Sequence, residues 1–202
     1  TPDKLVPSDE SLDAFYKYDT FTVSGTATRT ITLKRPFAQI NVATGDTEKA
    51  ANAGLTVAET WFEVSGAFNT LNLATGTASG TATLTYARAA KPADTEKITA
   101  NSKEYDLLGV IYVLANEGES PLNNVKFSYN RNAGEAAVKS VEVPSAPIKR
   151  NARTNLVGNI LTGNNGFDVD VDEGFEDTIT PEDVFATQLA AGGSFALNGD
   201  LA

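Results

Sequence analysis

The sequence contains no cysteine, no histidine and no methionine among its 202 residues. The absence of cysteine excludes a disulfide framework and leaves the redox compartment undetermined. The absence of both histidine and cysteine excludes the commonest nucleophile–base pairs and the imidazole and thiolate metal sites. Because the chain starts at Thr1 without an initiator methionine, we expect a processed or truncated product whose targeting segment is absent.

Long apolar runs and positive charge are also scarce. The longest apolar stretch is Leu107–Ala115. It is much shorter than the roughly 18 residues of a membrane helix, so we expect no membrane insertion by this chain. The chain carries 16 basic and 26 acidic residues and a formal net charge of −10. This balance argues against a nucleic-acid partner, because such affinity comes from neutralising phosphates, and it suits a soluble extracellular protein.

Alternation of apolar and polar residues with period two is the dominant pattern. It is clearest in Thr81–Tyr86, Val125–Asn130 and Phe167–Asp172, and it is typical of antiparallel sheets with one buried face. Leu107–Ala115 is apolar on both faces, which predicts a central strand. Further strands are predicted at 28–34, 37–43, 55–64, 138–143 and 154–161. Glycine- and asparagine-rich breaks between these segments have the spacing of a β-sandwich.

Helical patterns are few. Asp46–Asn52 has room for one or two turns before Gly54. Thr180–Asp183 has the pattern of a helix N-terminus: an N-cap threonine, a proline at the first helical position and acidic residues in the first turn. Gly192 is expected to end this helix. These patterns predict a short helical C-terminal extension to an otherwise all-β chain.

The chain is therefore divided into three parts. Residues 1–19 are polar and read as an N-terminal arm. Residues 20–177 form the predicted β-sandwich domain. Residues 178–202 form an extension, helix then strand, that either docks on the sandwich or opens a further domain.

Carboxylates are the only remaining catalytic candidates. Asp170 and Asp172 share a strand face with Cα atoms roughly 6.6 Å apart, which falls near the carboxyl separations of inverting glycosidases. Alternating aspartates on a strand are more often a solvated face that discourages edge aggregation. We favour that interpretation, and we assign no catalytic residue and no cofactor.

The acidic stretch from Asp168 to Asp177 is also a candidate calcium loop. An EF-hand needs glycine at its sixth position and glutamate at its twelfth. Counted from Asp168, those positions hold Glu173 and Ile179, so the motif fails. We favour a solvated strand end for this stretch and assign no metal site. Adventitious calcium binding is the alternative.

Trp61 is the only tryptophan and is followed by Phe62. Adjacent strand residues point to opposite faces, so one ring is expected in the core and the other nearer solvent. Trp61 is therefore either a packing residue or an exposed glycan contact.

Two basic doublets, Lys34–Arg35 and Lys149–Arg150, the second followed by Arg153, interrupt the acidic composition. Pairing with the surplus carboxylates is the favoured interpretation. A cleavage site for a basic-specific protease is the alternative.

Five segments, in order and spacing, resemble the fimbrillin-like proteins, the fimbrial subunits and cell adhesion proteins of Gram-negative anaerobes (Bacteroidales). They are Asp13–Tyr16, Thr32–Val42, Tyr105–Leu114, Ile148–Thr162 and Phe167–Phe175. The resemblance covers residues 13 to 177. Ile111 and Ala152 depart from the family's pattern at packing positions.

The resemblance implies a Greek-key, transthyretin-like β-sandwich that is exported as a lipoprotein and displayed at the outer membrane on the cell surface. In fibre-forming members, a neighbour's terminal strand fills a groove by β-strand addition. Phe195 and Leu197 in the extension would then be strand-exchange contacts. Compared with the family's pattern, we expect the first domain and the lipidation segment to be absent from this chain and residues 178–202 to be an added extension.

The sequence thus supports three hypotheses. The first is a non-enzymatic adhesion or fimbrial-type structural protein that acts through strand edges and exposed loops. Its partners would be other fimbrial subunits or host or bacterial surface ligands. The second is a glycan-binding β-sandwich module of a larger surface protein. The third, a carboxylate-only glycosidase, requires two acids from different strands to meet in a pocket.

Overall fold

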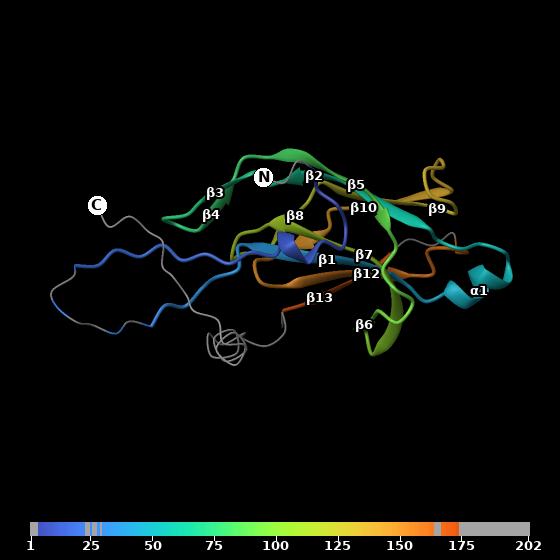
Figure 1. The fold of residues 1–202 in the computed structure, drawn as a ribbon, viewed down its shortest axis with the longest axis horizontal. Coiled ribbons are helices and arrows are strands. Elements are labelled where there is room, and N and C mark those ends of the chain that lie inside the picture. Colours follow the sequence, from blue (N-terminus) through green and yellow to red (C-terminus); the bar gives the residue numbers. More distant parts are fainter. Residues whose placement is uncertain (1–3, 23–24, 26–27, 29, 164–166, 174–202) are drawn as a thin grey trace.

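The computed structural model describes residues 4–22, 25, 28, 30–163 and 167–173. Two β-sheets pack face to face, so the predicted all-β sandwich is confirmed (Figure 1). In the described residues the helices are one α-helical segment, α1 (Thr47–Asn52), and the 3₁₀ turn η1 (Glu10–Leu12). Neither has the length and apolarity needed to cross a membrane.

The larger sheet has five strands in the order β13-β12-β1-β7-β6. Their bounds are β13 (Asp168–Asp172), β12 (Arg153–Gly158), β1 (Phe37–Thr44), β7 (Lys103–Leu114) and β6 (Lys97–Ala100). All neighbours are antiparallel except β1 and β12, which run parallel. The predicted central strand falls in β7, which is buried on both faces and lies beside the true centre, β1.

The smaller sheet has four antiparallel strands in the order β10-β9-β2-β5. Their bounds are β10 (Lys139–Pro144), β9 (Asn124–Asn130), β2 (Glu59–Ala67) and β5 (Ala82–Ala90). Two small two-stranded sheets complete the fold: β3 (Thr70–Asn72) with β4 (Thr77–Ser79), and β8 (Ser120–Pro121) with β11 (Pro147–Ile148).

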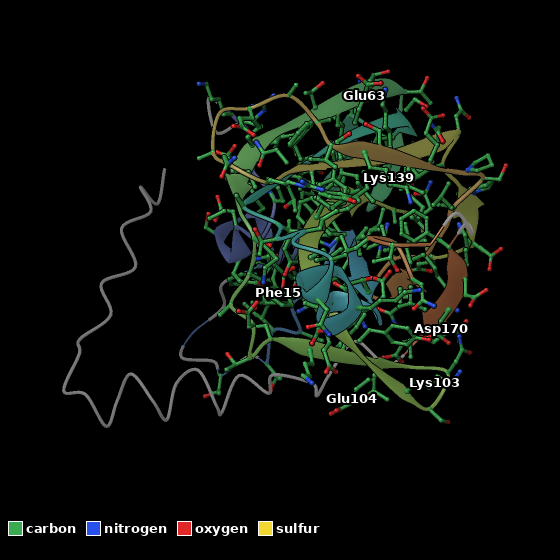
Figure 2. The ribbon with its side chains drawn as sticks, turned by 90° about the vertical axis from the view of Figure 1, so that its right-hand side faces the viewer. Phe15, Glu63, Lys103, Glu104, Lys139 and Asp170 are labelled. Atoms are coloured by element: carbon green, nitrogen blue, oxygen red, sulfur yellow. The ribbon has the colours of Figure 1, made fainter. Side chains whose placement is uncertain are left out.

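The main core lies between the two sheets. Its centre is aromatic: the Phe62 ring lies 5.2 Å from Phe127 and 6.3 Å from Tyr86, measured between ring centroids. The buried Tyr86 hydroxyl donates a hydrogen bond of 2.6 Å to the Tyr112 carbonyl of the opposite sheet. Gly109 interrupts the apolar run of β7 because a Cβ there would lie 3.0 Å from the Phe62 ring. Figure 2 views the sandwich from the α1 end, with Glu63 on the outer side of the four-stranded sheet.

The parallel pair of β1 and β12 brings together the two basic segments of the sequence. Val42 lies opposite Leu156 in the register. At the start of the pair, the Arg35 Nη1 atom donates to the Asn151 side chain at 2.9 Å, across 116 positions of sequence. A parallel pair cannot be closed by a tight turn, so most of the chain, including all of the four-stranded sheet, lies between these two strands.

A ladder of polar side chains crosses the outer face of the same sheet. Gln39 Nε2 donates to Asn41 Oδ1 at 2.7 Å, and Asn41 Nδ2 donates to Asn155 Oδ1 at 2.8 Å. Asn155 Nδ2 then donates to Asp170 Oδ2 at 3.0 Å. Asn41 and Asn155 are only 1% and 2% exposed, so these amides satisfy one another rather than binding water.

The described part of the N-terminal arm is bonded to both sheets. The Leu5 carbonyl accepts from Ala87 N of β5 at 2.7 Å, and Ser8 N donates to the Val110 carbonyl of β7 at 2.7 Å. Leu12 packs against the apolar residues of the main core and of a second cluster around Val110. The arm therefore covers apolar surface and is integral to the sandwich.

Two predicted strands differ from the structure, and five short strands were missed. The strand predicted at 28–34 is wrong: its described residues form only an isolated bridge, between Lys34 and Tyr16. The strand predicted at 55–64 begins at Glu59. The short strands β3, β4, β6, β8 and β11 were not predicted, because two to four residues give too little alternation to detect. The predicted extension 178–202, with Phe195 and Leu197, lies outside the described residues.

Replacing Asn155 by alanine should lower the free energy of unfolding by about 2 kcal/mol, because the buried Asn41 amide loses its acceptor. Urea unfolding monitored by Trp61 fluorescence measures this change. The control is Asn132→Ala, since Asn132 is exposed. Equal stability of the two variants would show that the ladder does not stabilise the sheet.

Candidate interaction surfaces

A loop, of which residues 14–22, 25, 28 and 30–35 are described and which we call the ribbon, extends from one end of the sandwich (Figure 1). Its base is closed by two hydrogen bonds, from Tyr16 N to the Lys34 carbonyl at 2.9 Å and from Lys34 N to the Tyr16 carbonyl at 2.8 Å. Every described residue from 17 to 34 is exposed. The ribbon holds five of the eight exposed large hydrophobic side chains of the described chain. They are Phe15, Tyr18, Phe21, Ile31 and Leu33.

The base of the ribbon is fixed to the body of the protein. Arg35 Nε donates to both carboxylate oxygens of Asp13, at 2.8 and 3.0 Å, and these side chains are 8% and 14% exposed. The Arg35 guanidinium also lies 4.6 Å from the centre of the Phe15 ring. The Tyr16 hydroxyl fills the space where a Cβ of Gly76 would lie, and Gly76 has a φ of +71°. The position therefore requires glycine for both space and conformation.

The basic doublets pair with carboxylates, which confirms their predicted structural role. Glu117 lies 3.8 Å from Lys34 and 3.4 Å from Arg150, so a single carboxylate joins the two doublets. Lys149 pairs with Glu173 at 2.7 Å. Arg153 pairs with its register partner Asp172 at 3.7 Å, a contact between β12 and β13.

Trp61 lies half-buried on the outer face of the four-stranded sheet, whereas Phe62 is fully buried in the core. The Arg88 guanidinium lies 4.5 Å from the centre of the Trp61 ring. This is a cation–π contact that covers part of the surface a sugar would stack on. Glycan contact by Trp61 remains a prediction.

The acidic strand β13 binds its own sheet. Asp170 accepts from Asn155, and Asp172 pairs with Arg153, so the two aspartates have different partners. No group of three or more metal-binding side chains occurs in the part of the chain that the structure describes. Glu176 and Asp177, which complete the calcium stretch considered above, lie outside that part.

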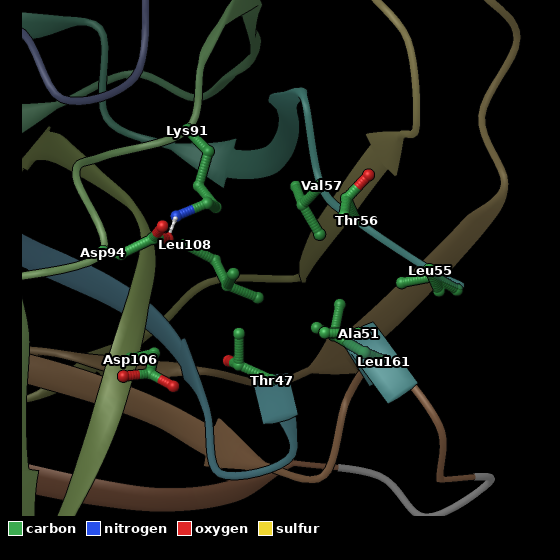
Figure 3. Close-up of a pocket in the computed structure, with 10 residues that line it drawn as sticks. All are labelled: Thr47, Ala51, Leu55, Thr56, Val57, Lys91, Asp94, Asp106, Leu108 and Leu161. Carbon is green, nitrogen blue, oxygen red and sulfur yellow. Dashed lines mark hydrogen bonds and ion pairs between the residues drawn. The ribbon is translucent and has the colours of Figure 1, made fainter. Parts of the chain in front are cut away.

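A cavity of about 210 Å³ opens beside α1 (Figure 3). The α1 helix lies at the opposite end of the sandwich from the ribbon (Figure 1). Apolar side chains make up half of its lining residues: Ala51, Leu55, Val57, Leu108 and Leu161. The rest are Thr47, Thr56, Lys91, Asp94 and Asp106. Sequence reasoning missed this cavity because its walls come from five separate segments, and no local pattern unites them.

Two features of the cavity are chemically distinctive. Lys91 Nζ lies 2.5 Å from Asp94 Oδ1 at the rim. The hydroxyl of Thr47 is buried and has no hydrogen-bond partner among the described residues. A buried hydroxyl without a partner is destabilising, so it marks a place where an incoming polar group is favoured.

Asp46 is a buried carboxylate just before α1, 5% exposed. It accepts hydrogen bonds from the Thr44 hydroxyl, from Leu161 N at 3.2 Å, and from Thr162 N and Oγ1 at 2.7 and 2.8 Å. Burial alone would raise the pKa of Asp46, but these donors outweigh it and hold the pKa below the ordinary 3.8. The carboxylate therefore ties β1 to the chain after β12.

Comparison with known proteins gives one family. A family model described as "Family of unknown function (DUF6562)" matches residues 1–193. No curated protein matches the chain.

Replacing Asp46 by asparagine should lower the free energy of unfolding at pH 7 by about 2 kcal/mol, because an amide cannot accept all four bonds. The pKa of Asp46 is depressed in the folded state. Its contribution is therefore fully present above the unfolded pKa and lost as pH falls through 3.8 toward the lower folded value. Urea unfolding between pH 7 and pH 3 should show a shallower pH dependence in the variant. Parallel profiles for both proteins would contradict this assignment.

Proposed function

The chain belongs to the family of unknown function DUF6562, and we propose that it is a non-enzymatic cell-surface adhesion or fimbrial-type structural protein. It acts through exposed loops and strand edges. The observation that carries the proposal is the ribbon, on which Tyr18, Ile31 and Leu33 are 55%, 48% and 55% exposed. Exposed apolar side chains gathered on one segment are typical of surfaces that bind other macromolecules.

The construction of the ribbon also supports this role. Its described residues form no strand beyond the Tyr16–Lys34 bridge, and its base is anchored by the Arg35–Asp13 pair and by the packing of Tyr16 against Gly76. Such an arrangement holds a binding loop on a rigid scaffold.

The carboxylates that accept the most hydrogen bonds join separate segments of the β-sandwich to one another. Asp46 joins β1 to the segment after β12, and Asp170 ends the polar ladder. Glu59 accepts from Asn130 Nδ2 and from Gly134 N, each at 2.8 Å, and so closes the loop after β9. These roles favour a structural protein over a carboxylate-only glycosidase.

The resemblance to fimbrillin-like proteins supplies the proposed location and partners. The protein would be exported as a lipoprotein, displayed at the outer membrane, and bound to other fimbrial subunits or to host or bacterial surface ligands. Exchange of a terminal strand through Phe195 and Leu197 remains a prediction.

Antibodies raised against the full chain test this proposal. Immunogold electron microscopy of intact cells of the source organism should show label on the outer surface, and deletion of the gene should remove the label and reduce adherence. Label that appears only after permeabilisation would contradict a surface role.

A glycan-binding module is the second candidate, and the half-buried Trp61 on the outer face of the four-stranded sheet is the observation that favours it. Sugar rings stack on the faces of aromatic side chains, and tryptophan has the largest aromatic face. On a glycan array, the full chain should retain a glycan that Trp61→Ala releases. The matched control is Glu63→Gln, which changes the next outward residue of β2. Equal retention by both variants would exclude Trp61 as the contact.

A further inference from the structure

The cavity beside α1 has two chemically different sides (Figure 3). Leu55 and Val57 lie toward one side, and Lys91, Asp94 and Asp106 lie toward the other. Small-molecule sites commonly combine an apolar lining with a few polar groups that fix the orientation of the ligand. This lining therefore matches a molecule that is apolar at one end and polar at the other.

The cavity is open at its mouth and covered at its floor. Ala51, Thr56 and Asp94 are exposed, whereas Leu108 and Leu161 are only 1% and 6% exposed. A small molecule can therefore enter without unfolding of the sandwich, and its inner end meets two leucines that water scarcely reaches.

The charged side chains of the lining are already paired within the chain. Lys91 Nζ lies 2.5 Å from Asp94 Oδ1, and Asp106 Oδ1 lies 3.7 Å from Lys97 Nζ. A charged ligand would have to leave water and compete with one of these pairs, which is unfavourable. The lining therefore favours an uncharged ligand.

Thr47 supplies a hydrogen-bonding group that the fold itself does not use. Its hydroxyl oxygen is buried and has no hydrogen-bond partner among the described residues. In Figure 3, Thr47 lies between the two sides of the cavity, and its hydroxyl is directed toward the charged side. A ligand hydroxyl held there would satisfy this group, whereas the apolar side gives water too few polar partners to hold it.

The volume of the cavity limits the ligand to about one ring. An apolar cavity of about 150 Å³ accommodates benzene, and this one measures about 210 Å³. It is smaller than the roughly 300–1,000 Å³ of sites for drug-sized ligands. A six-membered ring with a hydroxyl group therefore fits, and a larger molecule does not.

From these observations we propose that the cavity beside α1 binds small uncharged ring compounds that carry one hydroxyl group, of which phenol is the simplest. The ring packs against Leu55, Val57 and Leu161, and the ligand hydroxyl forms a hydrogen bond with Thr47 Oγ1. The site shares no residue with the ribbon and does not include Trp61. The inference is therefore independent of the proposed function and goes beyond it.

Titration of the isotope-labelled full chain with phenol, followed by two-dimensional NMR of the backbone amides, tests the site. We expect the amide signals of cavity residues such as Thr47, Ala51 and Leu55 to shift and to saturate. The expected Kd is on the order of 1 mM, which is ordinary for a ligand of about seven non-hydrogen atoms. Benzoate and benzylammonium, which are charged at neutral pH, should bind at least about tenfold more weakly.

Two variants separate the hydroxyl from the space around it. Thr47→Val keeps the shape of the side chain and removes its hydroxyl, so the affinity for phenol should fall about tenfold and the affinity for toluene should not fall. Ala51→Trp places a large ring at the exposed mouth and should abolish binding of both compounds. The matched controls, Thr85→Val and Ala74→Trp, change exposed residues outside the cavity and should bind like the wild type. The amide spectrum of each variant without ligand checks its fold.

Three results would overturn the proposal. The first is a phenol titration in which the shifts do not saturate or lie outside the cavity. The second is equal affinity of Thr47→Val and the wild type for phenol, which would remove the hydroxyl of Thr47 from the site. The third is binding of benzoate or benzylammonium as tight as that of phenol, which would contradict an uncharged ligand class. Immunogold labelling reports surface display separately, so failure here leaves the proposed function to its own test.

Discussion

The parallel pairing of β1 with β12 is the constraint on which the rest of the sandwich depends. It joins positions 114 residues apart, such as Asn41 and Asn155. Closing so long a loop has an entropic cost that grows only slowly with length, and the contacts along the pair offset it. Both outer neighbours are then positioned by this pair: β7 bonds to the free edge of β1, and β13 to the free edge of β12.

Buried polar groups fix the register of this pair. A shift by one residue would turn the buried apolar side chains outward, and a shift by two would separate Asn41 from Asn155, so the Asn41–Asn155 bond adds to the apolar pattern in fixing the register. Asp46 fixes the far end through four donors, and Arg35 fixes the near end through Asp13 and Asn151. A network in which each member is satisfied rigidifies a fold that has no disulfide.

The rigid frame explains why recognition is assigned first to the ribbon. The inner faces of the two sheets form the core, and the outer face of the five-stranded sheet carries the polar ladder and a second apolar cluster. Two backbone hydrogen bonds between Tyr16 and Lys34 close the base of the ribbon, and every described residue from 17 to 34 is exposed. Exposed apolar side chains are the part of a surface with most to gain from a partner.

The sequence by itself determined the strands with sustained alternation, the short helix before Gly54 and the pairing of the basic doublets with carboxylates. These depend on near neighbours and on overall charge, which are visible in one dimension. It did not determine the polar ladder or the cavity, whose parts come from separate segments. The alternation of Ile31 and Leu33 with polar residues also led to a strand being predicted at 28–34. The described residues of that segment pair only through the Lys34–Tyr16 bridge, so they do not form a strand. Only the tertiary structure decided which edges meet, because strand pairing is a long-range choice that local periodicity does not encode.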